Sequence, residues 1–275
     1  MLREKITCLI FSCDKFSDLW DGNLKMFRQN WPDRDFETYI ITDKPSERTF
    51  PDAKVIAAGS DVEWTDRLKF ALDYVKTKYV FLTLDDYFLI KPVSSERMER
   101  YVDLMEVGGY DYIRFFPRPK DATRDELPNV KGVFNVENNR RYSVNLYSCL
   151  WTKDFLAYTV KEPRTPWDYE VNLHKRAVEY NAKCLVCNNK EYEILDVVRK
   201  GKILHKAHWY FKKHPGVYDG NREVQSMWFE IKLWFKTEIN RYCPDFMRNF
   251  LRRIYVRFGG STFVDYEELY GKKQK

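Results

Sequence analysis

Three apolar, β-branched segments of the chain each run into acidic residues, and this pattern constrains the possible folds more than any other feature. The segments are residues 5–13, 36–43 and 78–90, and the acidic residues are Asp14, Asp43, Asp85 and Asp86. Continuous apolar runs of this length are typical of strands buried on both faces, as in a parallel sheet. Open α/β sheets bind their ligands at the carboxyl ends of such strands. We therefore expect the carboxylates to converge on a ligand site at one edge of the sheet.

Helical patterns alternate with these strands. Apolar residues at helical spacing from Leu68 to Val75 predict a helix that starts near residue 65. The remaining pattern predicts helices over 16–30, 95–107 and 166–180, strands over 53–59, 110–116, 142–151 and 183–187, and a long loop over 117–141. This alternation predicts an α/β fold with an open, mixed and mostly parallel sheet that is flanked by helices.

The length and the composition favour one folded catalytic domain with a helical appendage. Hydrophobic residues make up 44% and charged residues 32% of the 275 residues, a balance typical of globular proteins. We place the catalytic domain at residues 1–215 and a C-terminal amphipathic helical extension at 216–275. The net charge is +6, with basic residues concentrated in the last third, which indicates an anionic partner for that region.

The N-terminal apolar run and the cysteines indicate a cytoplasmic chain. Residues 6–12 are apolar, but Asp14 and Lys15 follow at once, so the run is too short for a signal peptide or a spanning helix. The six cysteines have no spacing typical of a disulfide framework. Cys184 and Cys187 lie in a predicted strand, where their side chains would face opposite ways. We interpret both as buried thiols, not as ligands of a zinc site with His205 and His208.

Asp85 and Asp86 are the most informative pair in the sequence. Carboxylates at the end of a buried strand can hold Mg²⁺ or Mn²⁺, which would bind a diphosphate through its other positions. Successive strand residues point to opposite faces, so we expect only one of the two to bind the ion directly. The alternative is that the pair merely forms a turn after the strand.

A set of segments resembles the bacterial family-2-like glycosyltransferases of the GT-A fold that build surface polysaccharides. The segments are Asp14 after the first strand, 64–68 (WTDRL), 79–87 (YVFLTLDDY) and 166–170 (PWDYE), and the resemblance covers about residues 1–210. The metal motif of that family is commonly Asp-X-Asp, whereas this chain has Asp85-Asp86-Tyr87. The resemblance implies a glycosyltransferase that uses a nucleotide sugar and a divalent cation, Mn²⁺ or Mg²⁺.

The resemblance also implies roles for residues of the donor half. Asp14 and Asp43 would contact the nucleoside, with Asp85 beside them, and Arg67 would bind the diphosphate. Arg67 suits this role unaided, because a guanidinium in the first turn of a helix offers paired donors to phosphate. Asp86 would hold the metal ion, and His205 or His208 could complete its coordination. The alternative for the histidine segment is that its basic residues neutralise the diphosphate.

On the acceptor side we expect a general base, because a sugar hydroxyl must lose its proton as it attacks. Glu170 is the first candidate and Asp168 the second, and Trp167 could stack on an acceptor sugar. The alternative is that both acids only stabilise the start of a helix behind Pro166. A retaining mechanism would need no base.

The sequence therefore predicts inverting transfer of a sugar from a nucleotide sugar to a glycan or lipid-linked acceptor, in the synthesis of a capsule, lipopolysaccharide or exopolysaccharide. A nucleotidyltransferase is the second enzyme hypothesis, although residues 12–15 lack the Gly-rich phosphate loop that such enzymes carry after the first strand. A non-catalytic carbohydrate-binding or scaffold protein is the third. Nucleic acid is not an expected partner, because no known motif accompanies the basic charge. The oligomeric state stays open.

The C-terminal extension contains an amphipathic segment at residues 246–258. Its apolar face comprises Met247, Phe250, Leu251, Ile254 and Phe258, and its basic side comprises Arg248, Arg252, Arg253 and Arg257. Such a helix can lie in an anionic membrane surface, which would place the chain peripherally on the inner face of the plasma membrane. Packing on protein or an oligomer contact is the equal alternative. We expect residues 223–239, also in helical register, to be able to pack on the catalytic domain.

Overall fold

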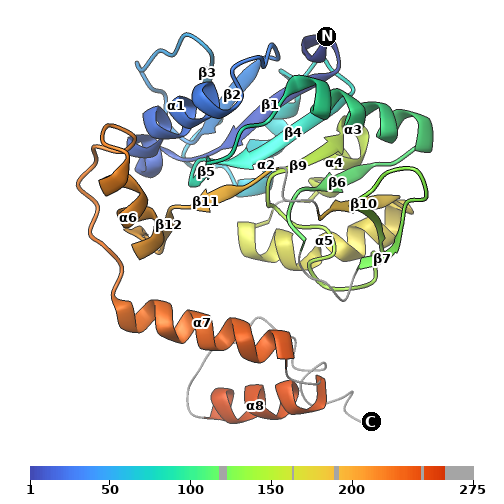
Figure 1. The fold of residues 1–275 in the computed structure, drawn as a ribbon, viewed down its shortest axis with the longest axis vertical. Coiled ribbons are helices and arrows are strands. Elements are labelled where there is room, and N and C mark those ends of the chain that lie inside the picture. The colour runs from blue at the N-terminus through green and yellow to red at the C-terminus, as the bar shows by residue number, and fades with distance from the viewer. Residues whose placement is uncertain (118–122, 163, 189–191, 243–244, 258–275) are drawn as a thin grey trace.

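A computed structural model describes residues 1–117, 123–162, 164–188, 192–242 and 245–257. Its centre is a nine-stranded sheet in the order β3-β2-β1-β4-β9-β6-β10-β8-β7 (Figure 1). The strands are β1 (Ile6–Phe11), β2 (Thr38–Thr42), β3 (Lys54–Ala57), β4 (Tyr79–Leu84), β6 (Tyr112–Arg114), β7 (Thr123–Glu126), β8 (Val133–Val136), β9 (Cys149–Thr152) and β10 (Cys184–Cys187). Within this sheet only β8 and β9 run against the other strands. The predicted open, mixed and mostly parallel sheet is confirmed.

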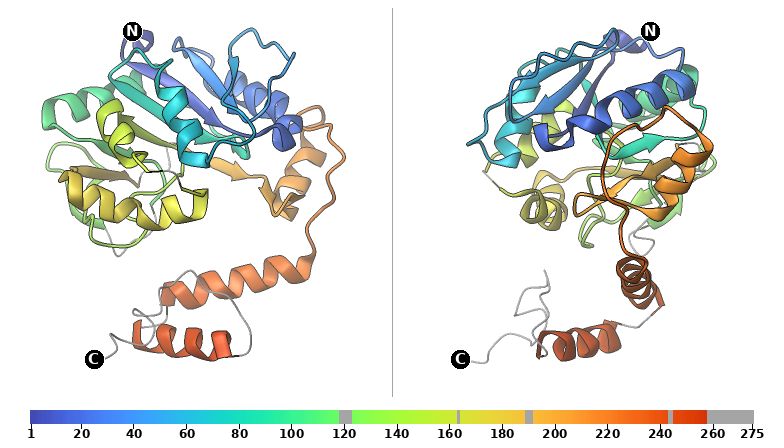
Figure 2. Two further views of the ribbon diagram at one scale, coloured as in Figure 1. Left: turned by 180° about the vertical axis from the view of Figure 1, so that it is seen from behind. Right: turned by 90° about the vertical axis from the view of Figure 1, so that its left-hand side faces the viewer.

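Helices cover both faces of the sheet (Figure 2). They are α1 (Trp20–Asn30), α2 (Trp64–Leu72), α3 (Ser95–Gly108), α4 (Lys153–Thr159) and α5 (Pro166–Tyr180), and short 3₁₀ turns lie at Leu2–Glu4 and Asp14–Leu19. Helix α5 has the predicted bounds, because Thr165 accepts a hydrogen bond from the Asp168 amide, Pro166 begins the helix and Asn181 ends it in the left-handed conformation.

The core consists of one apolar layer on each face of the sheet. Cys8 and Ile10 of β1 pack with α1 and α3, whereas Leu9 and Phe11 pack with α2, α4 and α5. The strand is therefore buried on both faces, as its continuous apolar sequence predicts. Cys184 and Cys187 likewise lie in opposite layers, as expected from their strand spacing, and both are buried thiols that form no disulfide among the described residues. Cys243 lies outside the described residues.

Three predicted segments differ from the structure. Residues 78–90 form two strands, β4 and β5 (Tyr87–Leu89), because the chain turns at Asp85 and Asp86. The predicted strand over 142–151 is wrong for its first part, since β9 begins at Cys149. The predicted loop over 117–141 contains the antiparallel pair β7 and β8, which extends the sheet.

The chain after β10 returns to the edge where the acidic residues lie. Strand β11 (Ile194–Asp196) pairs with β5, and β12 (Val198–Arg199) pairs with β13 (Lys202–Ile203), before helix α6 (His205–Lys213). The loop that follows packs back on this unit, because Val217 is buried in its core and Gln225 bonds with Ile203. The helical extension therefore begins near residue 227, later than the predicted residue 216.

The extension comprises α7 (Met227–Tyr242) and α8 (Asp245–Arg257), which lie apart from the sheet in Figures 1 and 2. Only the start of α7 touches the rest of the chain through described contacts, where Glu230 bonds with His205. Trp228 and Trp234 are 67% and 59% exposed, so the expected packing of residues 223–239 on the catalytic domain is not formed by these side chains. Among the described residues no helix combines the length and the apolar character that crossing a membrane requires.

Candidate functional site

The ends of three parallel strands bring the acidic residues together. The backbone amide of Asp14, after β1, donates to Asp43 Oδ1, after β2, over 2.6 Å. The end of β4 adjoins the end of β1, because the Asp85 amide donates to the Phe11 carbonyl oxygen at 3.2 Å. Burial raises the pKa of the Cys13 thiol, and the charges of Asp85 and Asp43 raise it further. The carboxylates that follow β1, β2 and β4 thus share one edge of the sheet, as their sequence positions predict.

Asp85 is buried and held in place by neighbouring hydrogen bonds. Ser12 Oγ donates to Asp85 Oδ2, and the Ser12 hydroxyl in turn accepts from Trp20 Nε1 at 2.7 Å. Asn23 Nδ2 donates to the backbone carbonyl oxygens of Asp85 and Tyr87, over 3.0 and 3.1 Å. These contacts fix the turn between β4 and β5, so Asp85 positions the carboxylate that follows it.

The pH dependence of stability should reveal this burial. Burial raises the pKa of Asp85 from 3.8 to about 7, although the Ser12 hydrogen bond opposes the rise. The folded protein therefore binds more protons than the unfolded chain between these values, and the stability contribution is lost as pH rises through about 7. We expect Tm of the ligand-free protein to fall between pH 5 and pH 8, and to fall less in Asp85→Asn. Equal falls in both proteins would contradict this assignment.

Asp86 and Asp196 form the centre of the site. Asp196 ends β11, opposite Tyr87 of β5, and the amide of Val197 donates to the Asp86 carbonyl oxygen at 2.9 Å. Arg199 holds Asp196 Oδ2 through Nε and Nη2, at 3.0 and 2.6 Å. The remaining oxygens, Asp86 Oδ1 and Asp196 Oδ1, are buried without a hydrogen-bond partner among the described residues. Burial raises the pKa of Asp86 well above its ordinary value, and the charges of Asp85 and Asp196 add to the rise.

The sequence analysis did not select Asp196. The signal was present, because the segment 194–196 is an apolar strand that ends in an acidic residue, like the three strands on which the prediction relied. The strand is only three residues long and pairs with β5 outside the main sheet. Its position beside Asp86 depends on a pairing across more than a hundred residues, which a local pattern does not contain.

A divalent cation fits the Asp86 side chain. Asp86 Oδ1 is buried without a hydrogen-bond partner among the described residues, and burial and the neighbouring carboxylates raise the pKa of the Asp86 carboxyl group. A positive ion beside this group would stabilise its charged form. Among the described residues no group of three His, Cys, Asp or Glu side chains is arranged to hold a metal, but Mg²⁺ characteristically takes one or two carboxylates and completes its shell with substrate phosphates and water. The predicted ligand His205 is engaged elsewhere, since its Nδ1 lies 2.8 Å from Glu230 Oε1.

The structure brings Glu170 to this centre and separates it from Asp168. Glu170, in the second turn of α5, accepts a hydrogen bond from the Leu146 amide at 3.5 Å. Burial raises its pKa, while the Leu146 amide and the Arg199 charge oppose the rise. Asp168 is exposed and bonds with Thr165 at the helix start, over 2.7 Å. Asp168 therefore stabilises the start of the helix, which was the alternative for both acids. The charge of Arg199 instead acts on both Glu170 and Asp196.

Arg67 lies in a second, open pocket of about 350 Å³. Its Nε and Nη1 are buried without a hydrogen-bond partner among the described residues, and its guanidinium lies 5.7 Å from the Phe11 ring centroid. The charge of Arg67 helps to lower the pKa of Asp43 against the effect of burial, so the pocket adjoins the Asp14–Asp43 pair. Trp167 lines the same pocket and is 63% exposed, which places it with the predicted donor residue Arg67.

Substitution of Arg67 should weaken the binding of an anionic ligand. We expect Arg67→Ala to raise the Kd for a nucleoside diphosphate by roughly tenfold or more, because charge-assisted hydrogen bonds are lost. Tm should change little, since Arg67 Nε and Nη1 have no hydrogen-bond partner among the described residues and only the Phe11 ring contact and the attraction to Asp43 are lost. Lys69→Ala, an exposed cation on the same helix, is the matched control in calorimetric titrations. Equal affinity of Arg67→Ala and wild type would exclude Arg67 from the binding site.

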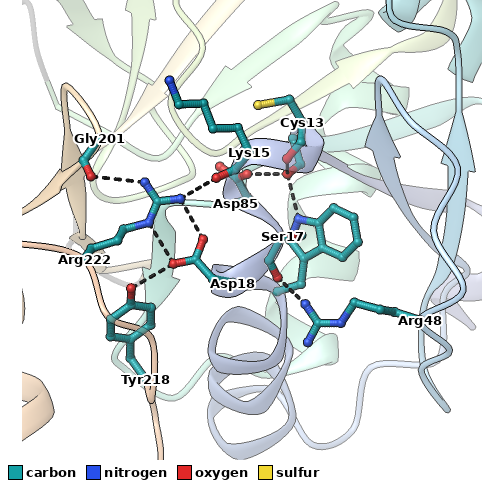
Figure 3. A network of polar contacts seen from close by, with 11 residues as sticks. Cys13, Lys15, Ser17, Asp18, Arg48, Asp85, Gly201, Tyr218 and Arg222 are labelled. Carbon is teal, nitrogen blue, oxygen red and sulfur yellow. Dashed lines mark hydrogen bonds and ion pairs between the residues drawn. The ribbon is translucent and has the colours of Figure 1, made fainter.

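A polar network joins the loop after α6 to the segment between β1 and α1 (Figure 3). Arg222 donates to both carboxylate oxygens of Asp18, over 2.6 and 2.7 Å, and to the carbonyl oxygens of Lys15 and Gly201. Tyr218 adds a hydrogen bond to Asp18 at 2.8 Å. Burial would raise the pKa of Asp18, but these contacts outweigh it and hold the pKa low. The loop after α6 is thereby fixed to the segment that joins β1 and α1.

No family model matches the sequence, and no curated protein matches it. Among solved structures, the chain is similar to TarS of S. aureus, with a TM-score of 0.50 and 13% identity over 96% of this chain and 46% of that one. It therefore spans about half the length of TarS. A TarS fragment, residues 1–349, in complex with UDP gives a TM-score of 0.47 with 13% identity, over 68% of this chain and 59% of that one. UDP-glucose pyrophosphorylase complexed with UDP-glucose gives a TM-score of 0.45 with 8% identity, over 70% of this chain and 92% of that one. The fold is GT-A-like.

Proposed function

We propose that this protein is a glycosyltransferase that moves a sugar from a nucleotide-sugar donor to a hydroxyl of a glycan or lipid-linked acceptor. The observation that carries the proposal is the Asp86 carboxylate oxygen at the carboxyl edge of the sheet, which is buried without a hydrogen-bond partner among the described residues. Asp86 offers a carboxylate ligand for a metal ion, the Arg67 guanidinium offers a positive charge for a diphosphate, and Glu170 offers a base. The GT-A-like fold and the resemblance of the sequence to enzymes of surface polysaccharide synthesis agree with it.

In this proposal the donor lies across the ends of β1, β2 and β4. Asp14 and Asp43, joined by their hydrogen bond, bind the nucleoside, and Arg67 donates to the diphosphate with its unpaired N–H groups. Asp86 would hold Mg²⁺ or Mn²⁺, which when bound neutralises the charge that develops on the leaving diphosphate. Asp85 keeps the Asp86 turn in place through Ser12 and Asn23.

Glu170 is the proposed base of an inverting reaction. Its raised pKa moves it toward the neutral range in which a base both exists as the carboxylate and accepts a proton readily. The carboxylate would take the proton of the acceptor hydroxyl as that hydroxyl attacks the anomeric carbon, while the nucleoside diphosphate leaves from the opposite side. Asp168, which bonds with Thr165, serves the helix and not this step.

The proposal is tested by supplying UDP-, GDP-, CMP- and dTDP-sugars with Mn²⁺ and measuring the free nucleotide that is released. We expect one donor to be cleaved slowly by water and faster when a suitable acceptor is present. Release of pyrophosphate from a nucleoside triphosphate and a sugar phosphate would instead establish a nucleotidyltransferase. If the protein shows neither activity but binds a glycan, the scaffold hypothesis is favoured.

We also propose that the helical extension binds an anionic membrane surface, where a lipid-linked acceptor would lie. Helix α7 exposes Met227, Trp228, Ile231, Trp234 and Phe235 at the spacing of one helical face. Helix α8 adds Met247, Phe250, Leu251 and Ile254, all at least 38% exposed; Phe258 lies outside the described residues. The sequence of residues 199–257 contains fourteen Lys and Arg against five Asp and Glu, so this apolar surface is accompanied by charge that complements anionic lipid.

The two exposed tryptophans of α7 should dominate this association. We expect the wild-type chain to sediment with phosphatidylglycerol vesicles and the Trp228→Ala/Trp234→Ala variant to bind about tenfold more weakly, because two large apolar rings are lost from the interface. Higher salt should weaken the binding of both proteins. Tyr74→Ala, an exposed aromatic residue on another surface, is the control. Equal sedimentation of the variant and wild type would contradict the proposed surface.

A further inference from the structure

A cavity of about 540 Å³ is lined in part by Asp196, and none of the assigned donor residues lines it. Aromatic residues form part of its wall: Phe116, Tyr147 and Tyr192. Its polar lining includes Asp196 and the ion pair of Lys91 with Glu193, whose Nζ and Oε2 atoms are 2.5 Å apart. The volume falls within the range of small-molecule sites, which combine apolar walls with a few placed polar groups.

The aromatic wall is a preformed flat platform. The Phe116 and Tyr147 rings are stacked with centroids 3.8 Å apart and planes 3° apart, and Tyr147 stacks on Tyr87 in turn at 5.0 Å. Because Tyr87 directly follows Asp86, the stack runs from the cavity to the acidic centre. Three stacked rings have little freedom left to lose when a ligand binds, so the platform suits recognition of another flat apolar face.

The charges of the cavity favour a neutral ligand that donates hydrogen bonds. Asp196 Oδ1 is a buried acceptor without a partner among the described residues, and an O–H group would satisfy it at little cost in desolvation. The Lys91 ammonium is paired with Glu193, so it is not available to balance a phosphate. With Asp86 beside Asp196, an anionic ligand would meet repulsion. A polyhydroxylated ring with an apolar face can stack on the aromatic wall and donate a hydrogen bond to Asp196 Oδ1.

The cavity also reaches the proposed base. Burial raises the pKa of Tyr147 to about 12, and the charges of Asp196, Glu170 and Asp86 contribute to the rise. The amide of Leu146, the residue before Tyr147, lies 3.5 Å from Glu170 Oε1, so the proposed base adjoins the segment that forms this wall of the cavity. A hydroxyl at the inner end of a ligand in the cavity would lie near Glu170, whereas the rest of the ligand would lie along the aromatic wall.

We propose that this cavity is the acceptor subsite and that it takes a neutral sugar ring, stacked on the wall that Phe116 and Tyr147 form and hydrogen-bonded to Asp196. Its role as acceptor subsite rests on the proposed function, whereas its capacity to bind a neutral sugar does not. Trp167, the acceptor residue expected from the sequence, lies in the Arg67 pocket and takes no part in this subsite.

The test is ligand-observed NMR with methyl glycosides of glucose, galactose, mannose and N-acetylglucosamine, in EDTA and without a donor. We expect at least one neutral glycoside to bind, and glucose 1-phosphate to bind more weakly. Phe116→Leu, which keeps apolar volume but removes the flat ring, should raise Kd about tenfold, and Asp196→Ala should raise it similarly. Trp209→Ala, an exposed aromatic residue on α6, should leave Kd unchanged.

Two results would overturn the inference: no binding of any neutral glycoside by the wild-type protein, or glycoside binding that Phe116→Leu and Asp196→Ala leave intact. Donor binding, measured separately with nucleotide sugars and Mn²⁺, distinguishes this failure from failure of the proposed function. If glycosides bind and no nucleotide sugar does, the cavity is a sugar site and the transferase proposal fails. If Phe116→Leu weakens nucleotide-sugar binding instead, the cavity belongs to the donor and the acceptor assignment is wrong.

Discussion

Asp86→Asn is expected to lower the rate of sugar transfer by about 10²–10³-fold or more without destabilising the protein. The rate falls because the cation that stabilises the leaving diphosphate loses its carboxylate ligand, and single electrostatic groups in active sites contribute on this scale. The fold should tolerate the change, because Asp86 Oδ1 has no partner to lose and the raised pKa of Asp86 shows that its charge is unfavourable in the folded state. Turnover measurements test the expected loss of rate, and Tm measurements test the expected stability of the variant.

The matched control for this experiment is Asp73→Asn, which removes an exposed carboxylate at the end of α2. It should retain the activity of the wild type. We expect Tm of Asp86→Asn to equal or exceed that of the wild type, and the stabilisation of the wild type by Mn²⁺ with nucleotide to disappear in the variant. A variant that transfers sugar at the normal rate would show that Asp86 holds no cation in the reaction.

Glu170→Gln is expected to lower kcat by roughly 10²–10⁴-fold, the range for loss of a general base, with little change in the KM of the donor. The amide keeps the shape of the side chain and can still accept from the Leu146 amide, so the effect should be chemical. In the wild type, burial raises the pKa of Glu170 above its ordinary 4.5. The base is therefore lost as pH falls through this raised value, and kcat should decline on the acidic side.

The pH profile separates a catalytic role of Glu170 from a structural one. The acidic decline in kcat should be absent from the residual activity of Glu170→Gln, whereas a merely distorted site would keep the profile. Asp168→Asn, whose side-chain oxygen can still accept from the Thr165 hydroxyl at the start of α5, should keep most of the activity. A larger loss in Asp168→Asn than in Glu170→Gln would transfer the role of base to Asp168.

The strands that precede the acidic edge could be predicted because their signal is local. Strands β1, β2 and β4 are apolar throughout and are followed by acidic residues, so both their burial and the shared position of Asp14 and Asp43 follow from the chain. Helix α5 was also predictable, since Thr165 and Pro166 define its start.

The features that the sequence analysis missed depend on contacts between distant segments. Strand β7 is largely exposed and charged, and it forms only because β8 extends the sheet beside it. Asp196 reaches Asp86 through the pairing of β11 with β5, and Arg222 reaches Asp18 across about two hundred residues. The predicted metal ligand His205 was chosen from the resemblance, but the pairing with Glu230 of α7 decides its environment.

The central claim is that the Asp14, Asp43, Arg67 and Asp86 edge binds a nucleotide sugar through a divalent cation. The most direct measurement is the thermal shift of the wild type and Asp86→Asn with UDP-, GDP-, CMP- and dTDP-sugars, each with and without Mn²⁺. The account predicts a rise in Tm for one nucleotide, dependent on Mn²⁺ and absent in the variant, because a ligand that binds only the folded state stabilises it. No rise with any nucleotide, or an equal rise in the variant, would contradict the account.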